Sequence, residues 1–310
     1  MKYLKDLREG DRVSEIYLCK TRNAAITKNG KPYENVTLQD KTGSMDAKIW
    51  EPNSEGIGEF SPLDYVNIFG DVVSFNGQLQ ISVKRTRRCR EGEYNPADYL
   101  PVSERDKGEM RADLTALIGG VKNKYLHALL SSFFVEDTDF LKKFEVSSAA
   151  KSVHHGFVGG LMEHTISVAK LCVHLAETYP LLHHDLLVSA ALLHDIGKTK
   201  ELSAFPENDY TDEGQFLGHI YMGAQMIETR CAEIAEFPKQ LRMELVHCIL
   251  AHHGKLEFGS PKKPSTPEAL ALSYADELDA KLETFKELKE NAKAPGWQGY
   301  NRLFENNIFV

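Results

Sequence analysis

The stretch ALLHDIGKTKEL, residues 191–202, joins an apolar helix-forming run to a histidine, an aspartate and a lysine. The His-Asp dipeptide occurs twice in the chain, whereas composition alone predicts roughly 0.7. The first, His184-Asp185, precedes the apolar run, and we expect Asp185 to be the N-cap of a helix there. The second, His194-Asp195, ends the run. A buried imidazole and carboxylate cost desolvation free energy unless they are paired or coordinated, so this second pair predicts a functional site.

The length and composition are those of a globular protein. The 310 residues are 42% hydrophobic and 26% charged, and the length favours two domains. No apolar run reaches the roughly 18 residues of a membrane span, and the charged start MKYLKDLREGDRV is unlike a signal peptide, so we expect a cytoplasmic protein with no membrane partner. The five cysteines are scattered without a CxxC motif, which argues against a disulfide framework or a thiolate zinc site.

Charge is distributed unevenly along the chain. Residues 1–90 carry 15 Lys and Arg against 12 Asp and Glu, whereas residues 91–310 carry 22 against 33. A basic first part joined to an acidic second part is consistent with a polyanion-binding module attached to a metal-rich one. Unequal solvated surfaces explain the same numbers equally well.

Residues 1–95 predict a small β-barrel. From residue 13 to residue 88 the sequence alternates apolar and polar residues in short runs, which are separated by turns such as Asn29-Gly30 and Asn76-Gly77. About five strands in about ninety residues suit a Greek-key barrel, and the OB-fold is the commonest such barrel that binds oligonucleotides. Other small barrels remain the alternative.

A basic cluster and several aromatic residues give this part a candidate nucleic-acid interface. The basic residues lie at the end of the last expected strand and are Lys84, Arg85, Arg87, Arg88 and Arg90. Lys and Arg bind phosphates whatever the base sequence, and exposed aromatic side chains such as Tyr33, Trp50 or Phe75 stack on bases. The alternative is a solvated strand edge, with the aromatic residues in the core.

The second part is helical in its hydrophobic period. Residues 96–106, which include two prolines, predict a linker, and residues 107–310 predict an all-α domain with its core at about 150–290. We expect helices at about 107–118, 122–133, 136–144, 163–178, 185–195, 218–234, 238–253 and 267–291. The last should be capped by Thr266, with Pro267 at its first position.

Polar residues interrupt the apolar faces of these expected helices at widely separated positions. They are His164, His194, Asp195, His219, His247, His252, His253 and Asp276. Each costs desolvation free energy unless it is paired or coordinated. Imidazole and carboxylate are ligands of Mn, Fe, Zn and Ni, so a shared metal site explains these residues more economically than independent core histidines do.

The order of four of these residues resembles a known family. His164, His194-Asp195 and Asp276 reproduce the pattern H…HD…D of the HD-domain metal-dependent phosphohydrolases. The flanking stretches HHGFVGGLMEHT, LLHDIGK and AHHG closely resemble the YhaM type of bacterial 3′→5′ exoribonuclease, in which an OB-fold nucleic-acid module precedes the HD domain. The resemblance covers nearly the whole chain in domain order. It implies an all-β OB-fold barrel followed by a helical HD bundle.

The resemblance also implies a ligand set. His164, His194, Asp195 and Asp276 would hold a first divalent ion, and His219 and His252 would hold a second that Asp195 bridges. His253 competes with His252, because adjacent helical residues diverge by about 100° and we expect one of them to face elsewhere. Mn²⁺ is the expected metal, with Fe, Co, Ni or Zn as alternatives and one or two ions per chain. Of the preceding histidines, we expect His155 to contact phosphate and His154 to have no role.

The expected reaction is hydrolysis of a phosphodiester. A metal bound by such ligands makes water acidic enough to attack near neutral pH, and Lys198 would neutralise charge on the phosphoryl oxygens, unless it only complements a helix dipole. We therefore expect Asp195 and Lys198 to be catalytic, with Asp279 orienting a ligand or lying on the surface. The expected substrate is single-stranded RNA, or DNA as well, and the 3′→5′ direction rests on the resemblance alone.

Three other functions fit parts of this pattern. An HD phosphohydrolase that acts on nucleotides or cyclic nucleotides would need the same metal ligands. An RNA-binding protein with a degenerate HD core is disfavoured by the intact ligand set, and a di-iron oxygenase has no obvious use for a nucleic-acid module. The sequence leaves open whether the chains assemble into a homo-oligomer.

Overall fold

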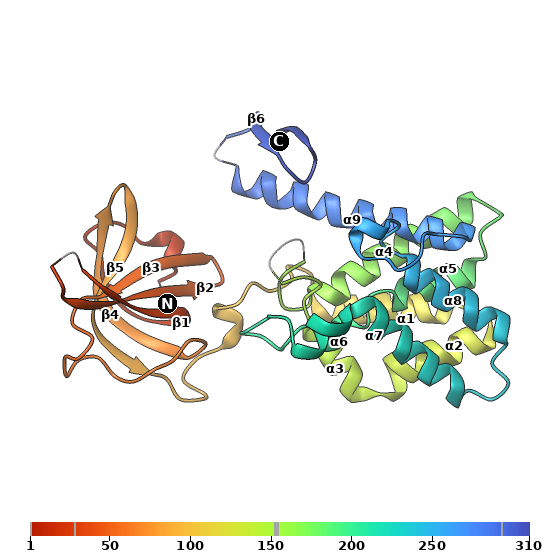
Figure 1. Ribbon diagram of the computed structural model, residues 1–310, viewed down its shortest axis with the longest axis horizontal. Helices are drawn as coiled ribbons and strands as arrows, with labels where there is room; N and C mark the ends of the chain where they lie inside the picture. The colour runs from red at the N-terminus through yellow and green to blue at the C-terminus, as the bar shows by residue number, and fades with distance from the viewer. Residues whose placement is uncertain (1, 28, 152–154, 293) are drawn as a thin grey trace. The chain divides into compact units, whose positions relative to one another are not determined.

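The computed structural model describes residues 2–27, 29–151, 155–292 and 294–310 (Figure 1). The chain divides into two compact units, Met1–Val102 and Ser103–Val310, and the division falls within the segment for which the sequence predicts a linker. Within the described ranges, no helix combines the length and the apolar character needed to cross a bilayer.

The first unit is a closed five-stranded barrel. Its strands are β1 (Arg12–Ile26), β2 (Pro32–Asp40), β3 (Gly43–Ile49), β4 (Tyr65–Phe75) and β5 (Gln78–Arg88). They follow the order β1-β2-β3-β5-β4, and β1 pairs with β4 to close the barrel. The β3–β5 pair is parallel and the others are antiparallel. This topology is that of an OB-fold and confirms the predicted fold.

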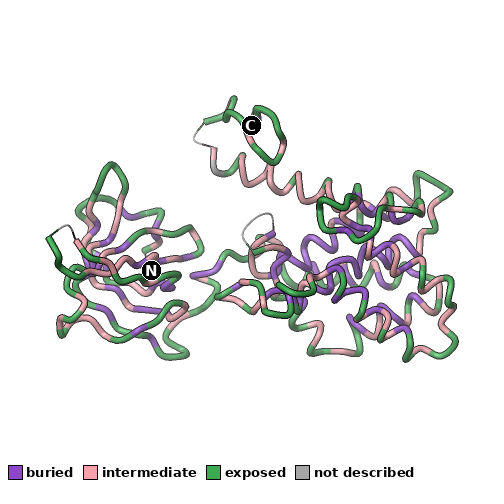
Figure 2. Tube along the Cα trace, viewed as in Figure 1, coloured by how far each residue is buried: buried purple, intermediate pink, exposed green. Residues whose placement is uncertain are grey.

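The alternation of side chains explains why these segments form a barrel. Tyr17, Leu38, Val66 and Ile81 point inward and are fully buried, and buried and exposed residues alternate along the strands (Figure 2). The Asn76-Gly77 turn joins β4 to β5, and both residues have positive φ, 52° and 78°, as a two-residue hairpin turn requires.

The second unit is a helical bundle. Its helices are α1 (Lys107–Gly120), α2 (Lys124–Ser131), α3 (Thr138–Val146), α4 (Gly160–Thr178), α5 (His184–Leu193), α6 (Lys198–Glu201), α7 (Asp212–Glu233), α8 (Lys239–Ala251) and α9 (Pro267–Asn291). Short helical turns occur at η1 (Leu4–Asp6), η2 (Pro96–Asp98), η3 (Ser132–Glu136) and η4 (Leu256–Phe258). Every residue of α5 from Leu186 to Leu193 is buried, and α5 packs on α2, α4, α8 and α9. The His194-Asp195 pair, which directly follows the end of α5, and His164, near the start of α4, therefore lie in the core of the bundle.

The structure corrects several sequence-based expectations. The expected helix at 122–133 becomes α2 followed by a π-helical turn, and α7 begins at Asp212, with a kink at Gly218. Asp185 is not an N-cap: His183 caps α5, while Asp185 accepts the backbone N–H groups of Lys122 and Asn123. The second unit is also not wholly helical, because β6 (Trp297–Asn301) and β7 (Asn306–Phe309) form a hairpin after α9.

Candidate metal centre and nucleic-acid interface

His164, in the second turn of α4, is the first of the predicted ligands. Its Nε2 lies 3.2 Å from Nε2 of His194 and 3.1 Å from Oδ1 of Asp276. These three ligand atoms lie within 4.8 Å of one another, although the residues come from α4, from the turn after α5 and from α9. The imidazoles of His164 and His194 are almost fully buried. The fold thus brings three of the four residues of the H…HD…D pattern together.

Asp195 links this first group to a second one. Its Oδ2 lies 3.3 Å from Nε2 of His194 and 3.6 Å from Nε2 of His164. Its Oδ1 lies 3.4 Å from Nε2 of His219 and 3.6 Å from Nε2 of His252. One carboxylate oxygen therefore faces each group, which is the arrangement of a bridging ligand.

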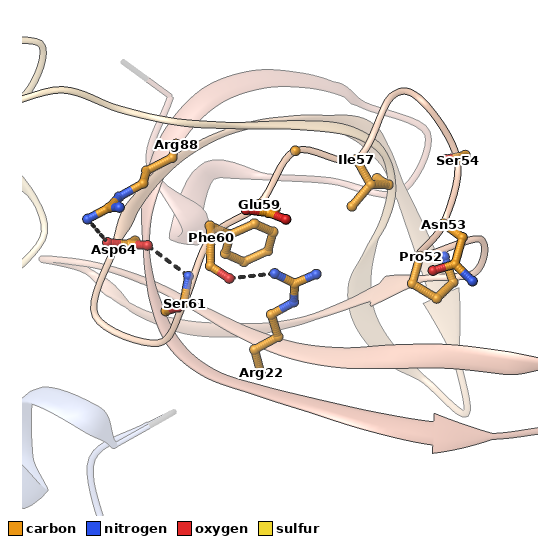
Figure 3. A pocket seen from close by; sticks show the side chains of 11 residues that line it. Arg22, Pro52, Asn53, Ser54, Ile57, Glu59, Phe60, Ser61, Asp64 and Arg88 are labelled. Carbon is orange, nitrogen blue, oxygen red and sulfur yellow. Dashed lines mark hydrogen bonds and ion pairs between the residues drawn. The ribbon is translucent and has the colours of Figure 1, made fainter.

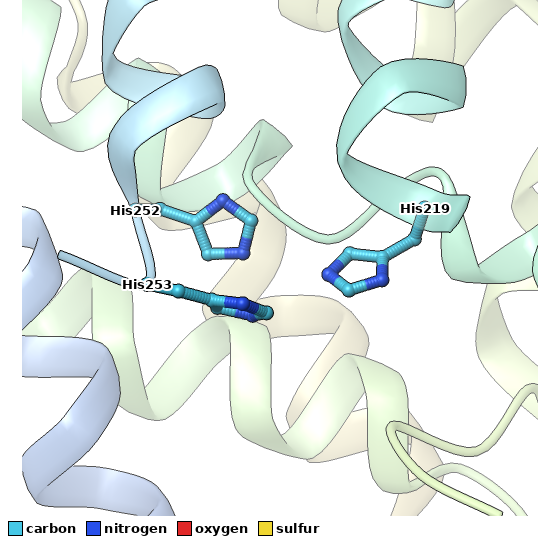
Figure 4. A group of neighbouring side chains, drawn as sticks. All are labelled: His219, His252 and His253. Carbon is cyan, nitrogen blue, oxygen red and sulfur yellow. The ribbon is translucent and has the colours of Figure 1, made fainter. Parts of the chain in front are cut away.

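The second group consists of His219 at the kink of α7 and His252 and His253 after α8 (Figure 4). Ligand atoms of the three imidazoles lie within 4.8 Å of one another. The expectation that His252 or His253 faces elsewhere is therefore wrong. Both residues lie between the end of α8 at Ala251 and the turn at Gly254, whose φ is 75°, and their ring centroids are 4.3 Å apart. Both imidazoles face His219.

Each of the five imidazoles is held by an interaction of its Nδ1 atom. Two of the partners are carboxylates: Oδ2 of Asp279 contacts His164, and Oε1 of Glu201 contacts His219. The other three are backbone carbonyl oxygens: Ala191 for His194, Ile249 for His252 and Phe258 for His253. All five distances are 2.7 to 2.9 Å. A carbonyl oxygen can only accept, so Nδ1 carries the proton in His194, His252 and His253. This leaves Nε2 with a lone pair for coordination.

Buried polar atoms in this cluster lack hydrogen bonds. Across the described chain, hydrogen-bond partners are missing for Oδ1 of Asp195 and for Nε2 of His219 and His252, whereas Oδ2 of Asp195 pairs with the ammonium group of Lys198. Such atoms cost free energy unless another group satisfies them. The atoms available to bind a metal here are imidazole nitrogens and carboxylate oxygens. In the part of the chain that the structure describes, none of the candidate ligand groups includes a cysteine, and the five cysteines are buried free thiols. The donor set therefore fits a divalent cation such as Mn, Fe, Co, Ni or Zn.

The electrostatics keep the carboxylates ionised. Burial alone would raise the pKa of Asp276, but its hydrogen bond with His164 lowers it well below the usual range. Burial opposes ionisation of Asp195 as well, and Lys198 and His194 hold the pKa of that carboxyl low. Burial would lower the pKa of His164, whereas Asp276 and Asp279 raise it to about 9. In the absence of a cation, His164 thus takes up a proton beside the two acids.

Lys198 is the first residue of α6 and approaches the bridging carboxylate. Its Nζ lies 2.6 Å from Oδ2 of Asp195, and its side chain is 14% exposed. At the first residue of a helix a lysine gains nothing from the helix dipole. The ion pair with Asp195 therefore accounts for its position, and its charge lies at the centre.

His155 is buried behind His164. Its Nε2 lies 3.1 Å from Oδ2 of Asp279, the same oxygen that His164 contacts, and its Nδ1 has no hydrogen-bond partner in the described part of the molecule. Only 2% of His155 is exposed, which does not favour the phosphate contact expected from the sequence. Its position instead supports Asp279, which orients His164. His154 lies outside the described residues.

Glu201 is a functional residue that sequence reasoning missed. It is the last residue of α6, six residues after Asp195, and its carboxylate contacts His219. Gly197 permits this arrangement, because a Cβ atom there would lie 2.0 Å from the carbonyl oxygen of His219. Gly218, with a φ of 70°, produces the kink that turns His219 inward. The available signal was the glutamate of KTKEL, four residues after Gly197, together with a second glycine, Gly218, directly before His219.

The basic cluster of the barrel is largely paired with neighbouring groups. Lys84 pairs with Asp71, Arg87 with Glu93 and Arg88 with Asp64. The guanidinium of Arg85 lies over the ring of Phe69, 4.7 Å from its centroid. The cluster is therefore less positive than its sequence suggests, although Lys84, Arg87 and Arg88 have side chains that are more than half exposed.

Trp50 lies at the end of β3 and is 47% exposed. It stacks on Tyr33, with ring centroids 5.3 Å apart and an interplanar angle of 26°. A cleft of about 540 Å³ lies over the same barrel between Arg22, Phe60, Asp64 and Arg88 (Figure 3). Arg22 pairs with Glu34 there and Arg88 with Asp64, so the cleft offers polar edges with little net charge.

Comparison with known proteins finds a family model and several relatives that resemble this chain. Residues 161–281 match the HD domain family model. A protein named 3′-5′ exoribonuclease YhaM, from Bacillus subtilis (strain 168), is 36% identical over 303 residues, covering 97% of this chain and 95% of that protein. A protein of the same name from Geobacillus sp. (strain WCH70) is 34% identical, covering 97% and 92%. The solved second OB-fold domain of replication protein A from Methanococcus maripaludis aligns with 30% of this chain and 100% of that domain, at 17% identity and a TM-score of 0.22.

Proposed function

The chain belongs to the YhaM family of 3′-5′ exoribonucleases, and on that premise we propose that it removes nucleotides from the 3′ end of single-stranded RNA by metal-dependent hydrolysis. The observation that carries the proposal is the buried carboxylate of Asp195. Each of its two oxygens faces a separate group of imidazoles, and Oδ1 lacks a hydrogen bond among the described residues, while Oδ2 pairs with Lys198. A site of this kind is suited to two divalent ions.

The residues divide naturally between the two ions. His164, His194 and Asp276 would hold the first, His219, His252 and His253 the second, and Asp195 would contribute to both. We propose Mn²⁺ as the ion; donors that are nitrogen and oxygen without sulfur accept it, as they also accept Fe, Co, Ni and Zn, which are the ions to compare. When bound, such ions stabilise charge on the phosphoryl group and make water acidic enough to attack at neutral pH.

The protein's own residues supply orientation and charge. The Nδ1 interactions fix each imidazole, and Asp279 and Glu201 hold His164 and His219. Lys198 places a cation where negative charge develops on the phosphoryl oxygens. Among the described residues, the groups of candidate metal ligands contain histidine and aspartate but no cysteine, and water activated by the ions would serve as the nucleophile.

The barrel would hold the strand that leads to this site. Stacking of bases on Trp50 and Tyr33 is tolerant of base sequence, as an exonuclease requires. The exposed cations at the end of β5 would contact phosphates after exchanging their internal partners. The same contacts suit single-stranded DNA, which is a second polymer substrate to compare.

The test is an assay on a 5′-labelled single-stranded RNA. The purified protein should shorten the RNA from its 3′ end in steps and release mononucleotides, lose this activity in a chelator and regain it with Mn²⁺. Parallel reactions with DNA, free nucleotides and cyclic nucleotides define the substrate class. Release of phosphate from free nucleotides, or opening of cyclic nucleotides, without shortening of RNA would contradict the proposal and favour a small-molecule phosphohydrolase.

A further inference from the structure

The turn that follows His253 carries exposed apolar side chains beside the metal centre. It runs from Gly254 to Gly259, and both of these glycines have positive φ, 75° and 88°. Between them, Leu256 is 56% exposed and Phe258 is 51% exposed. Large apolar side chains at this exposure cost hydration free energy in the free protein. The turn therefore exposes two large apolar side chains next to the segment that carries His252 and His253.

Hydrogen bonds hold the turn against the ligand-bearing segment. The carbonyl oxygen of Phe258 accepts a hydrogen bond from Nδ1 of His253 at 2.7 Å, and the backbone N–H of Lys255 donates to the carbonyl oxygen of His253 at 2.9 Å. A single imidazole ring therefore separates the backbone of Phe258 from the Nε2 atom that is free for coordination. The backbone of Phe258 thus lies one imidazole ring away from the candidate metal centre, and its half-exposed side chain extends from that position.

A cation accompanies the aromatic ring. Nζ of Lys255 lies 4.9 Å from the centroid of the Phe258 ring, which is cation–π geometry. In the described part of the chain, the partner of the Lys255 ammonium group is the Phe258 ring and not a carboxylate, and the exposed Glu257 lies between the two residues in sequence. An aromatic ring and an ammonium group that has no carboxylate partner among the described residues together match the two parts of a nucleotide, its base and its phosphate.

We propose that the Lys255–Phe258 turn is the subsite for the 3′-terminal nucleotide of the RNA, with Phe258 stacking on the base and Lys255 contacting the phosphate backbone. This inference rests on the proposed function. An exonuclease must hold each successive terminal nucleotide whatever its base. Stacking meets that need because every base has a π-face, and base–aromatic stacking contributes about 1–3 kcal/mol per base. A hydrogen-bonding pocket would favour particular bases.

The test compares Phe258→Ala, Phe258→Trp and the control Tyr179→Ala in the full-length protein loaded with Mn²⁺. Tyr179 is 51% exposed and lies at the opposite end of α4 from His164, so Tyr179→Ala should leave kcat/KM and Mn²⁺ stoichiometry at wild-type values. We expect Phe258→Ala to lower kcat/KM for a single-stranded RNA by at least about fivefold, and Phe258→Trp to restore it. The backbone carbonyl remains in all variants, so Mn²⁺ stoichiometry measured by calorimetry should stay that of the wild type.

A second substrate isolates the base. On an RNA whose 3′-terminal residue is abasic, wild type and Phe258→Ala should react at equal rates, because there is no base to stack. Three results would overturn the proposed subsite even if the wild-type protein is an active nuclease. They are that Phe258→Ala lowers kcat/KM equally on both RNAs, that it lowers kcat/KM on neither RNA, or that it binds less Mn²⁺ than the wild type. Failure of the wild-type protein to shorten any RNA would instead overturn the proposed function, and the subsite with it.

Discussion

Glu201 holds His219 through two hydrogen bonds to a single oxygen. Oε1 accepts from the backbone N–H and from Nδ1 of His219, each at 2.9 Å. Burial would raise the pKa of Glu201, but its hydrogen bond with His219 lowers it, so the group is a carboxylate. The interaction fixes both the position of the backbone after the Gly218 kink and the rotation of the imidazole. Glu201 is thus a positioning residue for the second metal group.

We expect Glu201→Gln to weaken the second metal site more than the first. A glutamine keeps the size of the side chain but replaces a charged acceptor by a neutral one, and loss of such support typically lowers metal affinity about 10- to 100-fold. Titration with Mn²⁺ by calorimetry should show one site near wild-type affinity and one weakened site. Glu213→Gln removes an exposed acid from α7, the helix that carries His219, and is the control. Equal weakening of both sites would contradict the assignment.

Gly197→Ala should displace His219 from the opposite side. The new Cβ would lie 2.0 Å from the carbonyl oxygen of His219, a distance that forces the backbone to move. Overpacking of this kind costs about 1–3 kcal/mol, so Tm should fall and Mn²⁺ binding should weaken. Gly119→Ala in α1 is the matched control, because nothing lies within 4 Å of its Cβ and its Tm should not fall. Unchanged metal binding in Gly197→Ala would remove the positioning role of this contact.

The sequence predicted the elements that have strong periodic patterns, and it failed where tertiary contacts decide the outcome. The barrel strands and their Asn76-Gly77 turn follow from alternation and turn chemistry. The expected helix at 185–195 is two residues too long, because His194 and Asp195 leave the helix to face the other ligands. Periodicity within one segment carries no information about that convergence.

Long-range contacts also explain one further error, at Asp185, and one feature that the sequence did not predict, the pairing of the basic cluster. Asp185 precedes an apolar run, as an N-cap does, but it accepts hydrogen bonds from a segment some sixty residues earlier. The cations at the end of β5 form a dense cluster in sequence, yet Asp64, Asp71 and Glu93 pair with three of them in space. Long-range pairing of this kind is not visible in local charge density.

Asp185→Asn tests this long-range bond through its pH dependence. Burial would raise the pKa of Asp185, whereas His184 and the backbone N–H groups of Lys122 and Asn123 lower it below 3.8. A carboxyl with a depressed folded-state pKa contributes stability above its unfolded value, and this stability is lost as pH falls through the folded value. We expect the free energy of unfolding of the variant to be about 1 kcal/mol below that of the wild type at pH 7, and the difference to shrink progressively below pH 4. Asp139→Asn, at a side chain that is 92% exposed, is the control for denaturant unfolding at each pH.

Asp195→Ala should abolish hydrolysis and remove bound metal while most RNA affinity remains. The variant loses the one carboxylate that faces both groups of imidazoles, whereas the barrel contacts to the strand are untouched. Elemental analysis should show less than one ion per chain, and a gel-shift assay should show binding close to wild type. His174→Ala, at an exposed histidine of α4, should keep full metal content and activity. An active Asp195→Ala protein would refute the metal assignment.

The paired cations of the barrel give the last prediction. Replacing Arg85, Arg87 and Arg88 by glutamine should weaken RNA binding and reduce the slope of log K against log salt by about 0.7 for each cation that contacts phosphate, about 2 in all. Glu93→Gln should do the opposite, because it releases Arg87 from its ion pair for contact with phosphate. Glu9→Gln makes the same change in net charge at an exposed site with no cation of this cluster nearby in sequence, so it is the matched control. If Glu93→Gln and Glu9→Gln raise RNA affinity equally, the effect is one of net charge, and the end of β5 does not hold the strand.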